Sequence, residues 1–110
     1  MTRRRGEGFL RLMVQVDGFV YEKLNEESKE TGIDLSTIAV IAMHYAVIGK
    51  RGLDIFESRR LYNIEVEVTR SFDGLLREIG AGTATVRGQL VASGMTEALQ
   101  HVRRWQDAAG

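Results

Sequence analysis

Alternating apolar and polar residues near the start of the chain predict a short β-strand. Over residues 11–16 the two faces of such a strand differ in character. The apolar face comprises Leu12, Val14 and Val16, and the opposite face comprises Arg11, Met13 and Gln15. A strand with this pattern is half-buried and presents its second face to solvent.

Two helices are predicted after this strand. The first begins at Asp17, whose carboxylate can accept hydrogen bonds from free amides of the first turn, and ends before Gly32, which can adopt the left-handed conformation that terminates a helix. The second spans residues 37–49 and is apolar nearly all round, so it is buried on more than one side. One strand and two helices cannot cover their own apolar faces, and pairing the strands of two chains would cover them. The pattern therefore predicts an obligate homodimer.

The residues of this segment also follow one another at the spacing of a known family. The sequence RLMVQVD occupies residues 11–17, KETGI occupies residues 29–33, and Val20, Leu24 and Ser36 fall at matching places. Residues 9–50 thus resemble the ribbon-helix-helix repressors. The resemblance implies a mainly α fold with a short intermolecular β-ribbon, in which two chains pair their strands antiparallel and lay them in the major groove of double-stranded DNA.

The resemblance implies a role for each part of the segment. The base-reading side chains would be Arg11, Met13 and Gln15, since arginine can contact guanine, glutamine adenine, and methionine a thymine methyl group. The phosphate-binding groups would be the amides of Leu35, Ser36 and Thr37 at the start of the second helix, together with Arg3, Arg4 and Arg5 of the N-terminal arm. The dimer core would comprise Leu12, Val14, Val16, Leu24, Ile38, Ile41 and Tyr45.

The second half of the chain matches no motif, and residues 61–72 fit two kinds of element. As a strand, the apolar residues at even positions from 62 to 68 alternate with polar ones; as a helix, Leu61, Ile64, Val68 and Phe72 form a stripe. The β-branched content favours the strand without excluding the helix. A helix is expected over residues 71–79, and another from Thr96, as its N-cap, to residue 108.

These patterns divide the chain into three parts. Residues 1–8 form a basic arm, residues 9–52 the dimerisation and DNA-binding module, and residues 53–110 an extension of mixed α/β or helical character. Because the second helix has more apolar surface than one dimer interface needs, the extension is expected to pack on the dimer, to join dimers into tetramers, or to bind a protein partner.

Composition narrows the classes of function. The chain has no cysteine and offers no nucleophile with a base and an orienting group, so no enzyme activity, metal or cofactor is expected. No apolar run is long enough to cross a membrane, and no signal peptide is recognised, so a cytoplasmic protein without membrane contact is expected. Fifteen basic residues balance fifteen acidic ones, which argues against DNA binding by bulk charge alone.

Two functions from different classes follow. The first is a dimeric DNA-binding transcriptional repressor that reads the major groove with its paired strands. The alternative is a protein that has the fold but does not bind DNA, and that uses its apolar helices to bind or inhibit a protein partner. Arg11, Gln15 and the arginine arm favour the first function; the neutral net charge and the apolar Leu35 and Val40 favour the second.

Overall fold

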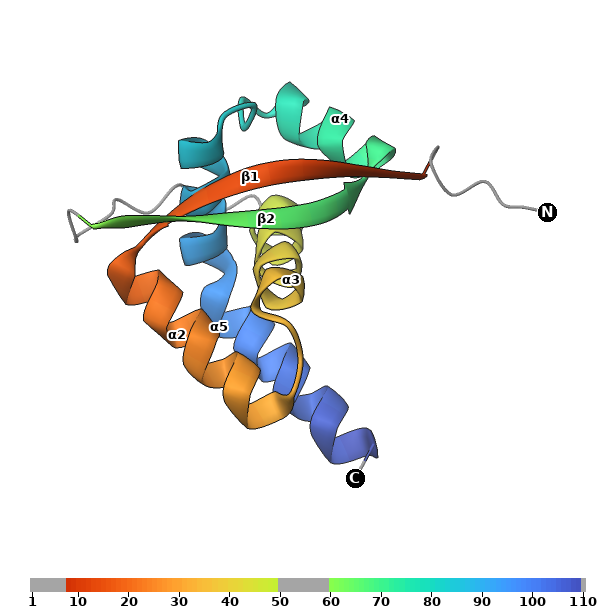
Figure 1. Ribbon diagram of the computed structural model, residues 1–110. Coiled ribbons are helices and arrows are strands. Elements are labelled where there is room, and N and C mark those ends of the chain that lie inside the picture. The colour runs from red at the N-terminus through yellow and green to blue at the C-terminus, as the bar shows by residue number, and fades with distance from the viewer. Residues whose placement is uncertain (1–7, 50–59, 110) are drawn as a thin grey trace.

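A strand followed by two helices occurs twice along the chain (Figure 1). The structure is a computed structural model, and it describes residues 8–49 and 60–109. The elements are β1 (Phe9–Asp17), α2 (Gly18–Thr31), α3 (Leu35–Ile48), β2 (Leu61–Thr69), α4 (Arg70–Glu78) and α5 (Ala84–Ala109). The protein is mainly helical with a small two-stranded sheet, as expected.

The two strands pair with each other inside one chain. They run antiparallel, from Phe9 opposite Thr69 to Asp17 opposite Leu61, and Met13 faces Glu65 at the middle of both strands. The expected intermolecular ribbon is therefore corrected to an intramolecular one. The physical reason is that residues 61–69 repeat the alternation of β1, and their backbone supplies the hydrogen bonds that a second chain was expected to supply.

The two halves begin in the same way. The last residue of each strand caps the following helix: the Asp17 carboxylate accepts from the Val20 amide at 2.9 Å, and the Thr69 hydroxyl accepts from the Phe72 amide at 3.1 Å. A glycine with positive φ then follows each first helix, Gly32 at 77° and Gly80 at 87°, where α2 and α4 give way to the next turn.

A single hydrophobic core lies between the ribbon and the helices α3 and α5. In Figure 1 the ribbon crosses these two helices, with α4 beside β1 and α2 on the opposite side. The residues predicted for a dimer core lie in this core of one chain: Val14, Val16, Leu24 and Ile38 are fully buried, and Leu12, Ile41 and Tyr45 are partly buried. Residues 60–109 contribute to the same core, so the expected packing of the extension on the module takes place within the chain.

The helix α5 is longer than expected. It starts at Ala84 and runs through Thr96 without a break, so the prediction that Thr96 caps a separate helix is wrong. The start lies earlier because the Thr83 hydroxyl accepts a hydrogen bond from the Val86 amide at 3.3 Å. Its crossing with α3 is very close at Gly94, where an added Cβ would lie 1.9 Å from the Ala42 carbonyl oxygen.

A buried carboxylate ties α2 to the far end of α5. Glu27 is 5% exposed and pairs with Arg103, which also lies 3.6 Å from Glu30. The hydrogen bond to Glu27 raises the pKa of Arg103.

No single helix within residues 8–49 or 60–109 is both long and apolar enough to span a membrane.

Candidate functional site

The outward face of the ribbon brings the three predicted base-reading residues together with three residues of β2. Because alternate residues of a strand point to opposite faces, the inward side chains fill the core, and the odd-numbered residues 9–15 and 61–69 face away from it. The central residues of this face are Arg11, Met13 and Gln15 on β1, and Glu67, Glu65 and Asn63 directly opposite them on β2. Of these, only Gln15 is partly buried.

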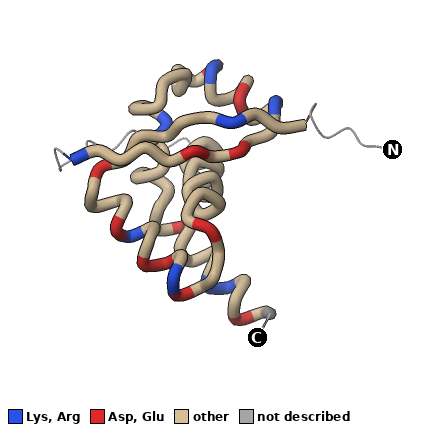
Figure 2. The backbone as a smooth tube through the Cα atoms, viewed as in Figure 1, with Lys and Arg blue, Asp and Glu red and all other residues tan. Residues whose placement is uncertain are grey.

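Glutamates on β2 give this face a negative charge. Arg11 lies 3.9 Å from a Glu65 oxygen and 3.8 Å from a Glu67 oxygen, and Figure 2 shows the opposite charges side by side across the two strands. Both distances are longer than a hydrogen bond, so Arg11 partly neutralises the two carboxylates but does not donate a hydrogen bond to either. Sequence reasoning did not connect the two glutamates with Arg11, because a second copy of β1 was expected in the place of β2. The alternation of residues 61–69 was the signal that could have revealed them.

Neighbouring elements hold the polar end of the ribbon face. The Gln15 amide nitrogen donates to the Asn63 side-chain oxygen at 3.4 Å, and the Gln15 side-chain oxygen accepts from the Thr85 hydroxyl at 3.0 Å. The first contact crosses the ribbon, and the second reaches the first turn of α5. Gln15 is therefore oriented by both halves of the chain.

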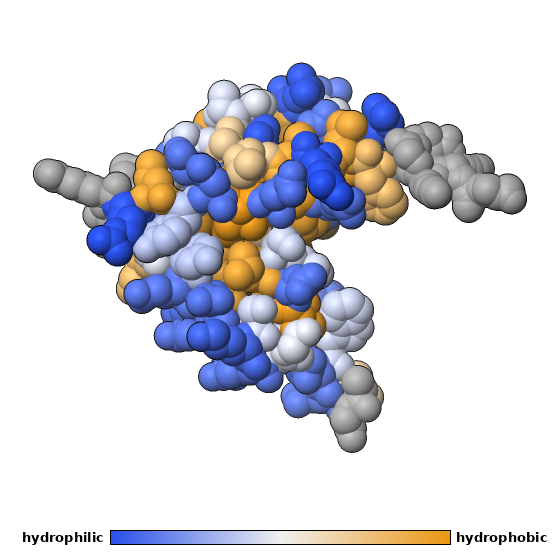
Figure 3. All heavy atoms as spheres, viewed as in Figure 1, coloured by the Kyte–Doolittle hydropathy of each residue, from blue (hydrophilic) through white to orange (hydrophobic). Residues whose placement is uncertain are grey.

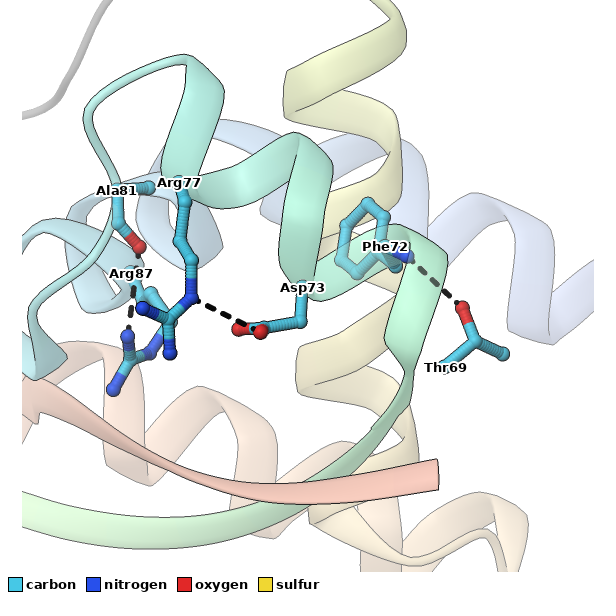
Figure 4. Close-up of polar contacts among 6 residues, drawn as sticks. All are labelled: Thr69, Phe72, Asp73, Arg77, Ala81 and Arg87. Carbon is cyan, nitrogen blue, oxygen red and sulfur yellow. Dashed lines mark hydrogen bonds and ion pairs between the residues drawn. The ribbon is translucent and has the colours of Figure 1, made fainter. Parts of the chain in front are cut away.

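A buried arginine fixes the start of α5 to the edge of β1. Arg87 is 8% exposed and donates to the Met13 carbonyl oxygen from Nε at 3.0 Å and from Nη2 at 2.7 Å. It also donates to the Ala81 carbonyl oxygen at 3.5 Å, as Figure 4 shows. Burial lowers the pKa of Arg87, and the charge of Asp73 opposes this shift. Asp73 itself accepts from Arg77 at 3.0 Å.

The predicted phosphate-binding amides lie at the start of α3, beside β2. Leu35, Ser36 and Thr37 are the first three residues of this helix. Its N-cap is Asp34, whose side chain makes no capping hydrogen bond. Ser36 and Thr37 line a groove with Asp34 and Glu67, so the positive end of the helix dipole stands next to carboxylates. The other predicted phosphate ligands, Arg3, Arg4 and Arg5, lie outside the described residues.

Apolar side chains are interspersed with polar ones along the ribbon. Phe9 and Met13 are exposed on its outward face. In Figure 3, hydrophobic and hydrophilic residues alternate along the ribbon, whereas the surface of α2 is mainly hydrophilic. The outward face of the ribbon thus presents hydrogen-bond donors, acceptors and apolar groups together.

No group of three or more metal-ligating side chains occurs within the described ranges. No protein family model matches the chain, and no curated protein and no solved structure is significantly similar to it. The functional assignment therefore rests on the residues and their arrangement.

Proposed function

We propose that the protein is a single-chain ribbon-helix-helix repressor in the cytoplasm, which binds double-stranded DNA with β1 and β2 in the major groove. The observation that carries this proposal is the repeated strand–helix–helix unit, whose paired strands project Arg11, Gln15 and Asn63 from one solvent-facing surface. Arginine, glutamine and asparagine are the side chains that make paired hydrogen bonds to purine edges.

The monomer takes the place of a dimer in this proposal. Two-fold symmetric dimers bind sites whose half-sites are related by the same symmetry. Here the two strands differ. The positions of Arg11, Met13 and Gln15 along β1 are occupied along β2 by Asn63, Glu65 and Glu67, in that order. The preferred DNA site is therefore not a palindrome.

The charge of the folded part of the chain limits its attraction to DNA. Within the described residues acidic side chains outnumber basic ones, and the compensating basic residues of the sequence fall in residues 1–7 and 50–59. Non-specific attraction of the folded body to phosphates is weak as a result. Affinity then depends on base contacts from the ribbon and on phosphate contacts from Arg3, Arg4 and Arg5, as proposed from the resemblance.

Selection from a pool of random duplexes, followed by fluorescence anisotropy at two salt concentrations, tests the proposal. The wild-type chain is expected to enrich one asymmetric sequence, and Arg11→Ala to bind that sequence more weakly by about 1–3 kcal/mol. Failure to enrich any sequence at low salt would refute DNA reading by this ribbon.

Removing the negative charges of the ribbon glutamates is expected to strengthen DNA binding, whereas Arg11→Ala is expected to weaken it. Replacing Glu65 and Glu67 together with glutamine is expected to raise the affinity for all DNA sequences, roughly tenfold at low salt, because two negative charges next to the phosphates are removed. The matched control replaces Glu22 and Glu26 on the exposed side of α2 with glutamine and should change the affinity little. Equal effects from both pairs would place the bound DNA elsewhere on the surface.

A second candidate function is binding of a protein partner without DNA. It is favoured by the same acidic residues, since Glu65, Glu67 and Asp34 lie around one groove at the edge of the ribbon. Such a surface suits a basic segment of another protein. The random-duplex experiment separates the two functions, because this second function predicts no enriched sequence.

A further inference from the structure

The groove between β2 and the start of α3 has a filled counterpart on the other side of the ribbon. It has a volume of about 480 Å³, and its lining includes Arg11, Asp34, Thr37, Val40, Glu65 and Glu67. The counterpart lies between β1 and the start of α5, where the Arg87 side chain contacts the strand. The repeated architecture of the chain relates these two places.

Matching residues establish the relation. Met13 and Glu65 are direct partners at the middle of the two strands, so they correspond to each other in the repeat. Two residues further along each strand, Gln15 on β1 corresponds to Glu67 on β2. Counted from the left-handed glycines Gly32 and Gly80, Thr37 corresponds to Thr85. Thr85 donates to Gln15 on one side, and Thr37 and Glu67 line the same groove on the other.

The two sides differ at several positions, and the difference that bears on a guanidinium is the arginine. Counted in the same way, the position of Arg87 is taken in α3 by Ala39, a buried residue with no polar side chain. The β2 side therefore keeps the corresponding threonine and strand but has no guanidinium of its own at this position.

The strand also offers an acceptor to this groove. The Met13 carbonyl oxygen accepts from Arg87, so it points to the outer edge of β1. In an antiparallel pair, directly opposite residues either bond to each other or both point away. The Glu65 carbonyl oxygen therefore points to the outer edge of β2, where Glu65 lines the groove.

The charges of the groove suit a cation. Asp34 has a carboxylate that is not used for capping, and Glu65 and Glu67 are 3.8 Å or more from Arg11. Three carboxylates against one arginine leave the lining negative. A guanidinium has five N–H donors in a planar fork, which can serve a carbonyl and carboxylates at once, whereas an ammonium is a compact and strongly hydrated charge.

We propose that this groove binds an arginine side chain from an extended basic segment of a partner protein, as the counterpart between β1 and the start of α5 holds Arg87. The partner's guanidinium donates to the Glu65 carbonyl oxygen and to the carboxylates of Asp34 and Glu67. This assignment supplies the chemistry of the second candidate function, and it is tested separately from DNA binding.

The probe is a blocked Gly-Arg-Gly tripeptide, titrated into the full chain while amide shifts are followed by NMR. We expect saturable shifts at Ser36, Thr37 and residues 65–67, at least fivefold weaker binding of the lysine tripeptide, and no saturation with the citrulline tripeptide, which keeps the shape without the charge. Equal binding of the lysine and arginine tripeptides would overturn the assignment to a guanidinium. Shifts at these residues caused by deleting residues 2–5, with no tripeptide present, would show that the groove is occupied by the chain itself and would overturn the assignment to a partner.

Variants locate the site. Asp34→Asn and Glu67→Gln are each expected to weaken tripeptide binding at least threefold, while Glu78→Gln, an exposed carboxylate on α4 across the ribbon, leaves it unchanged. Val40→Arg, which places a guanidinium on the groove wall, is expected to abolish binding. Unchanged binding in the Asp34 and Glu67 variants, with native spectra elsewhere, would show that the tripeptide binds at another place.

Discussion

Replacing Gly94 with alanine is expected to destabilise the protein by about 3 kcal/mol. The added methyl group would lie 1.9 Å from the Ala42 carbonyl oxygen and 2.8 Å from its carbon. Both atoms belong to the backbone of α3, so no rotation of a side chain can relieve the overlap, and the two central helices must separate. Chemical denaturation monitored by circular dichroism measures the change in the free energy of unfolding.

Gly74→Ala is the matched control for this substitution. Gly74 lies inside α4, and a Cβ there meets nothing within 4 Å. Alanine is expected to raise the free energy of unfolding by about 0.5–1 kcal/mol, since it has the higher helix propensity. A Gly94→Ala variant as stable as the wild type would mean that α3 and α5 do not cross as described.

Replacing Arg87 with methionine is expected to lower the free energy of unfolding by about 2–4 kcal/mol. The guanidinium is buried and donates to the carbonyl oxygens of Met13 and Ala81. Methionine has a similar length but no donor, so these acceptors lose their partner inside the protein. The result would show directly how much the contact between β1 and the start of α5 depends on Arg87.

Arg104→Met serves as the control on the same helix. Arg104 is exposed near the end of α5, and its replacement should change the free energy of unfolding by less than about 0.5 kcal/mol. If the two methionine variants unfold at the same denaturant concentration, the hydrogen bonds of Arg87 contribute little to the fold.

Local signals in the first half of the sequence predicted its elements well. The alternation at residues 11–16 became β1, the cap at Asp17 opened α2, and the left-handed Gly32 closed it. Each of these features depends on residues close together in the chain. The apolar character of α3 was also informative, because a helix with few polar residues must be covered by several neighbours.

The partner of β1 could not be derived from the same signals. An apolar face requires cover, but the requirement is met equally by a second chain and by a later segment of the same chain. Residues 61–69 carried the answer in their alternation, and Thr69 and Leu76 repeat the roles of Asp17 and Leu24. A competing helical stripe obscured this repeat, as did the shorter α4.

The candidate site was predicted on one strand and missed on the other. Arg11, Met13 and Gln15 share the outward face of β1, as the alternation required. Glu65 and Glu67 are polar positions in the alternation of residues 61–69, and nothing in the sequence relates them to Arg11. Only the register of the two strands brings them together and changes the charge of the ribbon.

The central claim, a ribbon made by two strands of one chain, is tested most directly by a cross-strand disulfide. Arg11 and Glu67 are direct partners on the outward face, and the chain has no cysteine of its own. The double variant Arg11→Cys with Glu67→Cys is therefore expected to oxidise readily, because directly opposite residues in such a ribbon are within reach of a disulfide. Mass spectrometry of the oxidised protein at micromolar concentration should give the mass of one chain with no free thiol, whereas covalent dimers as the main product would contradict the intramolecular ribbon.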